Sequence, residues 1–174
     1  MAPTPRSVTH RYVDSPVGEL LVAATERGVV YLAFACEDSA EVLARLNDKI
    51  GPVSKGTSPE LTLAAAQLDE YFAGARRTFS VPIDEALTSG FRQCVQRLLS
   101  DIPYGATSTY AQLADAAANP KAVRAVGSAC ARNPVPIIVP CHRVLRSDGS
   151  LGGYRGGVAA KELLLRLENG ALEF

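Results

Sequence analysis

The sequence predicts an α/β N-terminal domain, built from a small antiparallel sheet and helices, followed by a mostly α C-terminal domain with a helix-turn-helix. Near the start of the chain, short segments rich in Val, Leu and Tyr alternate with turn residues, a pattern typical of a strand meander. Further along, one amphipathic helix and two closely joined helices follow without strand patterns between them. The change places the domain boundary between residues 84 and 85, so the expected domains are 1–84 and 85–174.

The N-terminal domain is expected to alternate strands and helices. Apolar positions at helical spacing distinguish its two helices from its strands, and Pro59 suits the first turn of the second helix. Cys36 has no Cys or His near it in sequence and is expected to be a packing residue. The expected elements are an antiparallel meander at 8–14, 19–25 and 29–34, a helix at 39–50, a loop to residue 58, a helix at 61–72 and an edge strand at 79–83.

The C-terminal domain begins with an amphipathic helix at 91–102, in which Cys94 shares the buried face. Thr109 with Gln112 three positions later is a capping box that starts a helix through residue 118. Asn119 as N-cap and Pro120 at the first helical position predict a second helix to about residue 132. A connection this short predicts a helix-turn-helix. A last helix is expected at 158–169, with Leu163, Leu164 and Leu167 buried.

Composition excludes several classes of protein. The 174 residues are 47% hydrophobic, enough for one or two compact domains. No apolar run reaches the roughly 18 residues that span a bilayer, and the first ten residues lack the apolar core of a signal peptide. We therefore expect a cytoplasmic protein with no membrane partner. Four cysteines without a Cys-x-x-Cys spacing predict free thiols and no metal site.

Positive charge is concentrated in one part of a chain whose net charge is zero. Residues 1–84 carry 8 basic and 11 acidic side chains, whereas residues 85–174 carry 10 and 7. Between residues 120 and 161, the sequence has seven basic side chains and a single acidic one, Asp148. A basic stripe on a neutral protein indicates a polyanionic partner such as DNA, and a solvated face is the alternative.

The C-terminal domain is organised around residues 136–144, PIIVPCHRV. The β-branched residues 137–139 predict a short buried strand, and Pro140 should turn the chain before Cys141. A cysteine attacks as the thiolate, and at its usual pKa of about 8.5 only a few per cent is ionised, so a base must take the proton. His142 is the nearest base, and it can act only if Pro140 breaks the strand or a water bridges the two side chains. The alternative is a structural Cys beside a surface His.

This run resembles the PCHRV signature of the O6-alkylguanine-DNA alkyltransferases. The resemblance extends to IPYGATSTYAQLA, NPKAVRAVGSACARNPVPIIV and DGSLGGYRGG, and more weakly to DSPVGELLVAATERGVVYLAF and LDEYFAGARRTFSVPID in the N-terminal half. It implies a ribonuclease H-like N-terminal domain. It also implies an irreversible, single-turnover transfer of an alkyl group from O6-alkylguanine in double-stranded DNA to Cys141, with O4-alkylthymine left open as a second substrate and no cofactor.

The resemblance further implies roles for individual residues. Cys141 accepts the alkyl group, His142 held by Glu168 takes the thiol proton through a water, and Tyr110 donates toward the leaving guanine. The expected substrate-binding residues are Tyr154, Arg155, Gly156, Val144, Asn133 and Lys161, with Tyr154 stacking on the base, Asn133 a hinge and Lys161 steadying the active-site turn. The expected DNA-binding residues are Arg124, Tyr110, Lys121, Ala125, Ser128, Arg132 and Arg143.

DNA binding is expected in the minor groove. The second helix of the helix-turn-helix is nearly all Ala, Val, Gly and Ser, with little to hydrogen-bond a base edge in the major groove. The resemblance places this helix in the minor groove and lets Arg124 fill the stack left by a flipped guanine; a phosphate contact is the alternative for Arg124. We expect a monomer, with cooperative binding along DNA left open.

Five positions have a separate interpretation. Gln96 stands where the family usually has an aromatic residue, which we expect to affect packing rather than chemistry. Ala131-Arg132 replaces the more familiar Arg-Gly, which is expected to alter backbone phosphate contacts but not the reaction. Arg155 replaces a small residue found in some relatives, and this change is expected to restrict bulky adducts. Asn133 before a proline is also explained by a left-handed helix C-cap alone.

Two other classes of protein remain as alternatives. A cysteine hydrolase using Cys141 and His142 predicts turnover on an acyl substrate, but it gives no reason for the helix-turn-helix or Arg124. A non-catalytic, alkyltransferase-like protein that binds lesions explains the DNA-binding features. In those relatives the cysteine is replaced, so Cys141 argues against this alternative.

Overall fold

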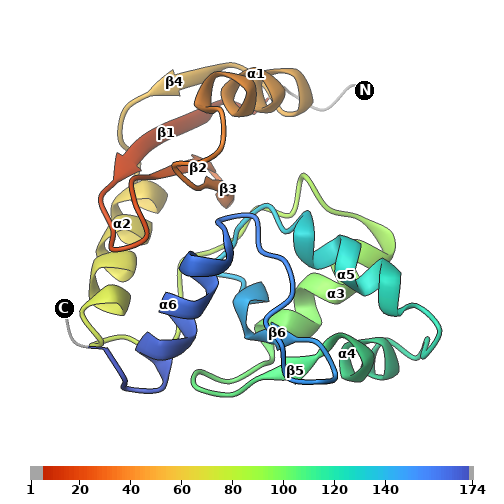
Figure 1. Cartoon of the computed structure of the whole chain (residues 1–174). Coiled ribbons are helices and arrows are strands. Elements are labelled where there is room, and N and C mark those ends of the chain that lie inside the picture. Colours follow the sequence, from red (N-terminus) through yellow and green to blue (C-terminus); the bar gives the residue numbers. More distant parts are fainter. Residues whose placement is uncertain (1–5, 173–174) are drawn as a thin grey trace. The chain divides into compact units, whose positions relative to one another are not determined.

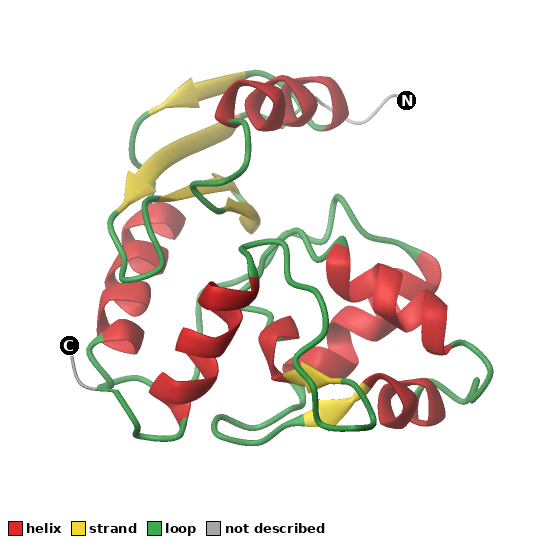
Figure 2. Ribbon diagram, in the orientation of Figure 1, coloured by secondary structure: helices red, strands yellow, loops and turns green. Residues whose placement is uncertain are grey.

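The structure, a computed structural model, describes residues 6–172. The chain divides into two compact units, Met1–Leu87 and Thr88–Phe174 (Figure 1). The first unit combines a sheet with two helices, and the second is mostly helical (Figure 2). Within the described residues, no helix is both long and apolar enough to cross a membrane.

A four-stranded mixed sheet forms the first unit. Antiparallel pairing between consecutive strands confirms the predicted meander. Residues 53–55, expected in a loop, instead pair in parallel with the first strand, so the prediction of a purely antiparallel sheet is wrong. This strand has only three residues and none is buried, so it carries no apolar alternation that a sequence could reveal. The sheet order is β3 (Gly28–Ala33), β2 (Leu20–Thr25), β1 (Val8–Val13) and β4 (Val53–Lys55).

The two helices of this unit begin at capping side chains. In α1 (Ser39–Lys49), the Asp38 carboxylate accepts from the backbone N–H of Glu41, and in α2 (Pro59–Phe72), Ser58 accepts from that of Leu61. Val42 and Leu46 of α1 join a core cluster with residues of β1, β2 and β3, and α2 packs on the same three strands. Every residue of β2 and β3 is buried, as expected when both faces of a sheet are covered.

Residues 79–83 do not form the predicted edge strand. Ile83 makes one isolated parallel bridge to Val29, and this bridge does not extend into a strand ladder. Pro82 has no N–H to donate, but its carbonyl accepts from the Val29 N–H at 2.9 Å. Cys36 is exposed, so its predicted packing role is also wrong.

The second unit contains four α-helices, one turn of 3-10 helix and a short parallel strand pair. The Thr109 and Gln112 capping box is confirmed, with each side chain bonded to the other residue's backbone N–H. The elements are α3 (Gly90–Ser100), β5 (Ser108–Thr109), α4 (Tyr110–Ala116), α5 (Val123–Ala131), η1 (Cys141–Arg143), β6 (Val144–Leu145) and α6 (Val158–Glu168).

The connection between α4 and α5 is longer than predicted. Ala118 adopts a left-handed conformation with φ 58°, which ends α4 early. A turn follows, which is closed by the hydrogen bond from the Ala122 N–H to the Asn119 carbonyl. Asn119 is therefore not the N-cap of α5, and Pro120 is not its first residue, as had been predicted. The α5 helix starts at Val123, and α4 and α5 pack against each other.

Two predictions of buried side chains in this unit need correction. Cys94 is exposed, because the buried side of α3 consists of Val95, Gln96 and Leu99. The apolar spacing alone could not show that a glutamine would occupy that side. In α6, Leu164 and Leu167 are buried as predicted, whereas Leu163 is only partly covered.

Candidate active site

The segment before Cys141 is a tight turn rather than the predicted strand. Val139 N–H donates to the Val135 carbonyl at 2.9 Å, and Ile137 has φ 73°. A left-handed β-branched residue is a genuine outlier that only a surrounding structure can hold, and Ile137 is 1% exposed. The chain then enters η1 at Cys141, with the Cys141 N–H bonded to the Val139 carbonyl. The strand is therefore broken, as cooperation between Cys141 and His142 requires.

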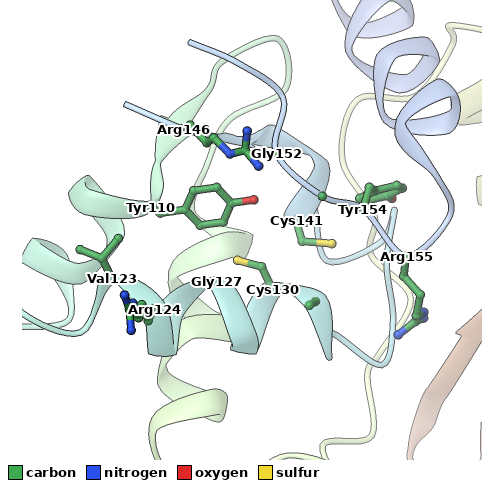
Figure 3. A pocket seen from close by; sticks show the side chains of 12 residues that line it. Tyr110, Val123, Arg124, Gly127, Cys130, Cys141, Arg146, Gly152, Tyr154 and Arg155 are labelled. Carbon is green, nitrogen blue, oxygen red and sulfur yellow. The ribbon is translucent and has the colours of Figure 1, made fainter. Parts of the chain in front are cut away.

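Cys141 opens into a cavity of about 570 Å³ (Figure 3). The thiol residue itself is only 5% exposed, so the cavity is its route to a substrate. Glycines and two tyrosine rings contribute to the walls, which suits a flat, mostly apolar ligand. The lining residues are Tyr110, Val123, Arg124, Gly127, Cys130, Ala131, Cys141, Arg146, Gly152, Gly153, Tyr154 and Arg155.

The two residues that follow Cys141 belong to a buried polar cluster. His142 Nε2 is 2.7 Å from Glu168 Oε1. Arg143 donates to both oxygens of the same carboxylate, each at 2.9 Å, and its Nη1 donates to the Ile102 carbonyl at 2.6 Å. All three side chains are at most 7% exposed, so the acid, base and cation are held without help from solvent.

This cluster fixes which nitrogen of His142 can accept a proton. Burial raises the pKa of Glu168, but hydrogen bonds from His142 and Arg143 outweigh it and hold that pKa at about 2. An ionised carboxylate accepts only, so Nε2 of His142 must carry the hydrogen. Nδ1 of His142 makes no hydrogen bond within the described residues. Burial lowers the pKa of His142, which keeps the ring neutral and Nδ1 unprotonated at neutral pH.

The thiol is buried in surroundings that oppose its ionisation. Burial raises the pKa of Cys141, and a hydrogen bond from the Asn133 side chain, with the charges of Arg155 and Lys161, lowers it in part. Cys130 lines the same cavity, but burial raises its pKa to about 12. Cys130 is therefore a thiol at neutral pH and a poor nucleophile.

Lys161 and Tyr110 both lie against the loop after β6. Lys161 is fully buried and its Nζ donates to the carbonyls of Val144, at 2.7 Å, and Leu151. Burial raises the pKa of Tyr110, so its hydroxyl stays a donor. Gly152 has φ 71°, and a Cβ there would lie 3.0 Å from the Tyr110 hydroxyl, so glycine allows the loop to pass close to this donor.

The predicted pocket residues occupy two different environments. Tyr154 and Arg155 line the cavity, and Gly156 follows them in the same loop. Asn133, Val144 and Lys161 are buried and do not line it. Asn133 also has no left-handed conformation, so the C-cap explanation for it is wrong.

The predicted DNA-binding residues also divide. Five of the seven are exposed on α5 or beside it, and Tyr110 lines the cavity. Arg143 is 6% exposed and its guanidinium is bonded to Glu168 and Ile102, which does not favour the predicted DNA contact. The exposed residues are Lys121, Arg124, Ala125, Ser128 and Arg132.

Outside the glycine-rich loop, five residues of the cavity wall had no predicted site role: Val123, Gly127, Cys130, Ala131 and Arg146. Arg146 lies among the basic residues that the charge count had already singled out, so a signal for it existed. Val123 and Cys130 follow the apolar period of α5, which is typical of core positions and gives no signal for a site, and Val123 is 38% exposed.

Two family profiles match most of the chain. The ribonuclease-like domain of 6-O-methylguanine DNA methyltransferase matches residues 8–85, and the DNA binding domain of the same family matches residues 90–170. The constitutive methylated-DNA–protein-cysteine methyltransferase of Bacillus subtilis is 41% identical over 156 residues, covering 89% of this chain and 92% of that protein. The methylated-DNA–protein-cysteine methyltransferase of Mycobacterium leprae is 40% identical over 161 residues, covering 91% and 90%.

Solved structures show the same likeness. Mycobacterium tuberculosis O6-methylguanine methyltransferase has a TM-score of 0.81 at 37% identity, covering 95% of this chain and 94% of that one. Mycobacterium tuberculosis OGT in complex with DNA has a TM-score of 0.80, also at 37% identity, and covers 95% of each chain. The small mixed sheet with helices followed by a helical second domain is thus a fold shared over almost the full length.

Proposed function

The chain belongs to the 6-O-methylguanine DNA methyltransferase family, and we propose that it repairs DNA directly by moving an alkyl group from O6-alkylguanine to Cys141. The observation that carries this proposal is the thiol of Cys141 at a cavity wall, next in sequence to a histidine whose Nε2 is bound to the ionised Glu168. A buried base oriented by a carboxylate is what an otherwise protonated thiol needs in order to attack.

The reaction follows from where protons can go. The thiol proton passes, through a water, to Nδ1 of His142, and Glu168 stabilises the resulting imidazolium. The sulfur then attacks the alkyl carbon, a C–S bond forms and the C–O6 bond breaks. Tyr110, kept protonated by burial, donates toward the guanine as negative charge develops on it. The product is a thioether on Cys141, and among the cavity residues that the structure describes no second base accompanies it, so each molecule acts once.

Double-stranded DNA is the partner, and α4 with α5 forms the helix-turn-helix that we propose to bind it. Lys121, Arg124 and Arg132 supply exposed positive charge on or beside α5. The small exposed residues Ala125 and Ser128 let the helix approach closely, which suits a minor groove with little sequence discrimination. We assign Arg124, at the cavity wall, to the stack vacated by a flipped alkylguanine.

The loop after β6 forms the base pocket in this proposal, with Tyr154 stacking on the guanine and Arg155 limiting adduct size. Arg155 Nη1 donates to the Asn133 carbonyl at 2.5 Å, which ties the loop to the end of α5. The first domain is proposed to be ribonuclease H-like, and the functional boundary near residues 84 and 85 remains a prediction.

Stoichiometry tests this function. Increasing amounts of the protein are mixed with a fixed amount of duplex carrying one O6-methylguanine, and the repaired guanine is measured. We expect repair to rise one-for-one with protein and then stop. A lesion-binding protein would leave the methyl group on the DNA, and a catalyst with turnover would repair more lesions than there are protein molecules.

A further inference from the structure

Gln96 is buried in the middle of α3, on the side that helices normally fill with apolar residues. The residue is 7% exposed, between Val95 and Leu99, which are both fully buried. Burying an amide is unfavourable unless its polar atoms are hydrogen-bonded. Gln96 meets this requirement with a bond from its Nε2 to Oδ1 of Asn133, at 3.0 Å.

Asn133 uses both ends of its side chain. Its Oδ1 accepts from Gln96 and also from the Val135 N–H at 3.0 Å, while its Nδ2 donates to the Val139 carbonyl at 2.8 Å. The backbone partners on each side fix the direction in which the amide points. With Oδ1 occupied by two donors, Nδ2 is the end of the amide that bonds to the Val139 carbonyl, in the turn that leads into Cys141. We call this turn the thiol turn.

The Val139 carbonyl links this amide to the nucleophile. It accepts from Asn133 Nδ2 at 2.8 Å and from the Cys141 N–H at 2.9 Å. A continuous set of bonds therefore runs from α3 through Asn133 to the backbone of the reacting residue. Because Ile137 within this turn is held in a left-handed conformation, the turn needs external contacts to keep its shape.

We propose that Gln96 is a positioning residue for alkyl transfer, which holds the Asn133 amide against the thiol turn so that Nδ2 stabilises the Cys141 thiolate. This inference rests on the proposed function, since it requires Cys141 to be the acceptor. It also revises the expectation that the glutamine affects packing alone. The donor on Gln96 polarises the Asn133 amide, and hydrogen bonds in such a chain strengthen one another.

The direction of the effect on the thiol follows from the contacts. Burial raises the pKa of Cys141, and the Asn133 side chain lowers it in part. Loss of the Gln96 donor weakens the effect of Asn133, so the pKa of the thiol rises and less thiolate is present at neutral pH. A glutamate at position 96 has the same size, but its carboxylate faces Asn133 Oδ1 and adds negative charge, so it raises the pKa of the thiol further.

The test compares Gln96→Leu and Gln96→Glu with wild type and with Arg92→Ala, an exposed control on the same helix. Single-turnover methyl transfer from an O6-methylguanine duplex is measured at saturating protein across pH, together with the melting temperature of each variant. At neutral pH we expect transfer to slow about three- to tenfold in Gln96→Leu, the loss of one hydrogen bond, and more in Gln96→Glu. Both losses should shrink at alkaline pH, where the thiol ionises without help.

The outcomes separate two failures. Wild type that transfers no methyl group would sink the proposed function, and with it the inference. Wild type that transfers normally, beside Gln96 variants with the wild-type pH profile or with the same loss at every pH, would overturn the positioning role alone. A role in packing would lower the melting temperature without moving the pH profile.

Discussion

Oε1 of Glu168, the last residue of α6, lies 2.7 Å from Nε2 of His142. A carboxylate is unfavourable at a helix C-terminus because of the helix dipole, so its presence there needs another cause. The cause is the guanidinium of Arg143, which donates to both carboxylate oxygens. Glu168 is thus fixed by a buried cation and in turn fixes the histidine tautomer that leaves Nδ1 free to accept the thiol proton.

Replacing Glu168 with glutamine should slow alkyl transfer at neutral pH. The imidazolium of His142 loses its stabilising charge, so the thiol proton has a poorer acceptor and the pKa of Cys141 rises. We expect a loss of about ten- to a hundredfold, since each unit of pKa is a factor of ten. Single-turnover rates across pH measure this, with Glu162→Gln, exposed on the same helix, as control. An unchanged rate and pH profile would remove Glu168 from the mechanism.

The same carboxylate should make stability depend on acid pH. The pKa of Glu168 in the folded protein is about 2, below its usual value of 4.5. A depressed carboxyl pKa stabilises the fold above the unfolded value and loses that contribution as pH falls through the folded one, so the effect should be full above pH ~4.5 and vanish near pH ~2. Free energies of unfolding of wild type and Glu168→Gln should converge in this window, and a constant difference throughout would contradict the assignment.

Arg143→Gln should destabilise the fold rather than weaken DNA contacts. Its removal leaves a buried carboxylate without its cation, at a cost of about 3 kcal/mol or more. Denaturant unfolding measures that cost. The salt dependence of DNA binding should stay as in wild type, whereas Arg132→Gln, which removes an exposed charge, should reduce the slope by roughly one phosphate contact. A reduced slope in Arg143→Gln would place that residue on DNA after all.

Arg124→Ala should separate base flipping from chemistry. If the guanidinium fills the vacated stack, its loss costs a few kcal/mol on the scale of unstacking one base, so repair of a duplex should fall by roughly thirtyfold or more. Reaction with the free base O6-methylguanine needs no flipping and should stay near wild type. Rates of the single variant on these two substrates decide the question. Equal losses on both would mean that Arg124 supports the pocket or the fold.

Local signals predicted most of the fold, and failures occurred where tertiary contacts decide the conformation. The meander, the capping box of Thr109 and most helix bounds follow from periodicity and capping side chains. The strand at 53–55 has no such signal, because pairing with β1 alone creates it. The Asn119-Pro120 cap was wrong because Ala118 turns left-handed first.

The site was predicted in composition but not in geometry. Motif residues identified Cys141, His142 and Glu168, yet a strand was expected where buried contacts hold Ile137 in a left-handed turn. Arg143 was assigned to DNA through the resemblance and as part of the basic stripe, and only the three-dimensional arrangement shows Glu168 beside it. Gln96 looked like a packing change because its partner, Asn133, is 37 positions away.

The central claim is that Cys141 is the single alkyl acceptor. Mass spectrometry of peptides, after wild type and Cys141→Ala are mixed with a duplex carrying one O6-methylguanine, tests it most directly. We predict one methyl group per wild-type molecule, on Cys141, and none on the variant, including at Cys130, whose pKa of about 12 keeps it protonated. A methyl group on Cys130, or on any residue of the Cys141→Ala variant, would contradict the account.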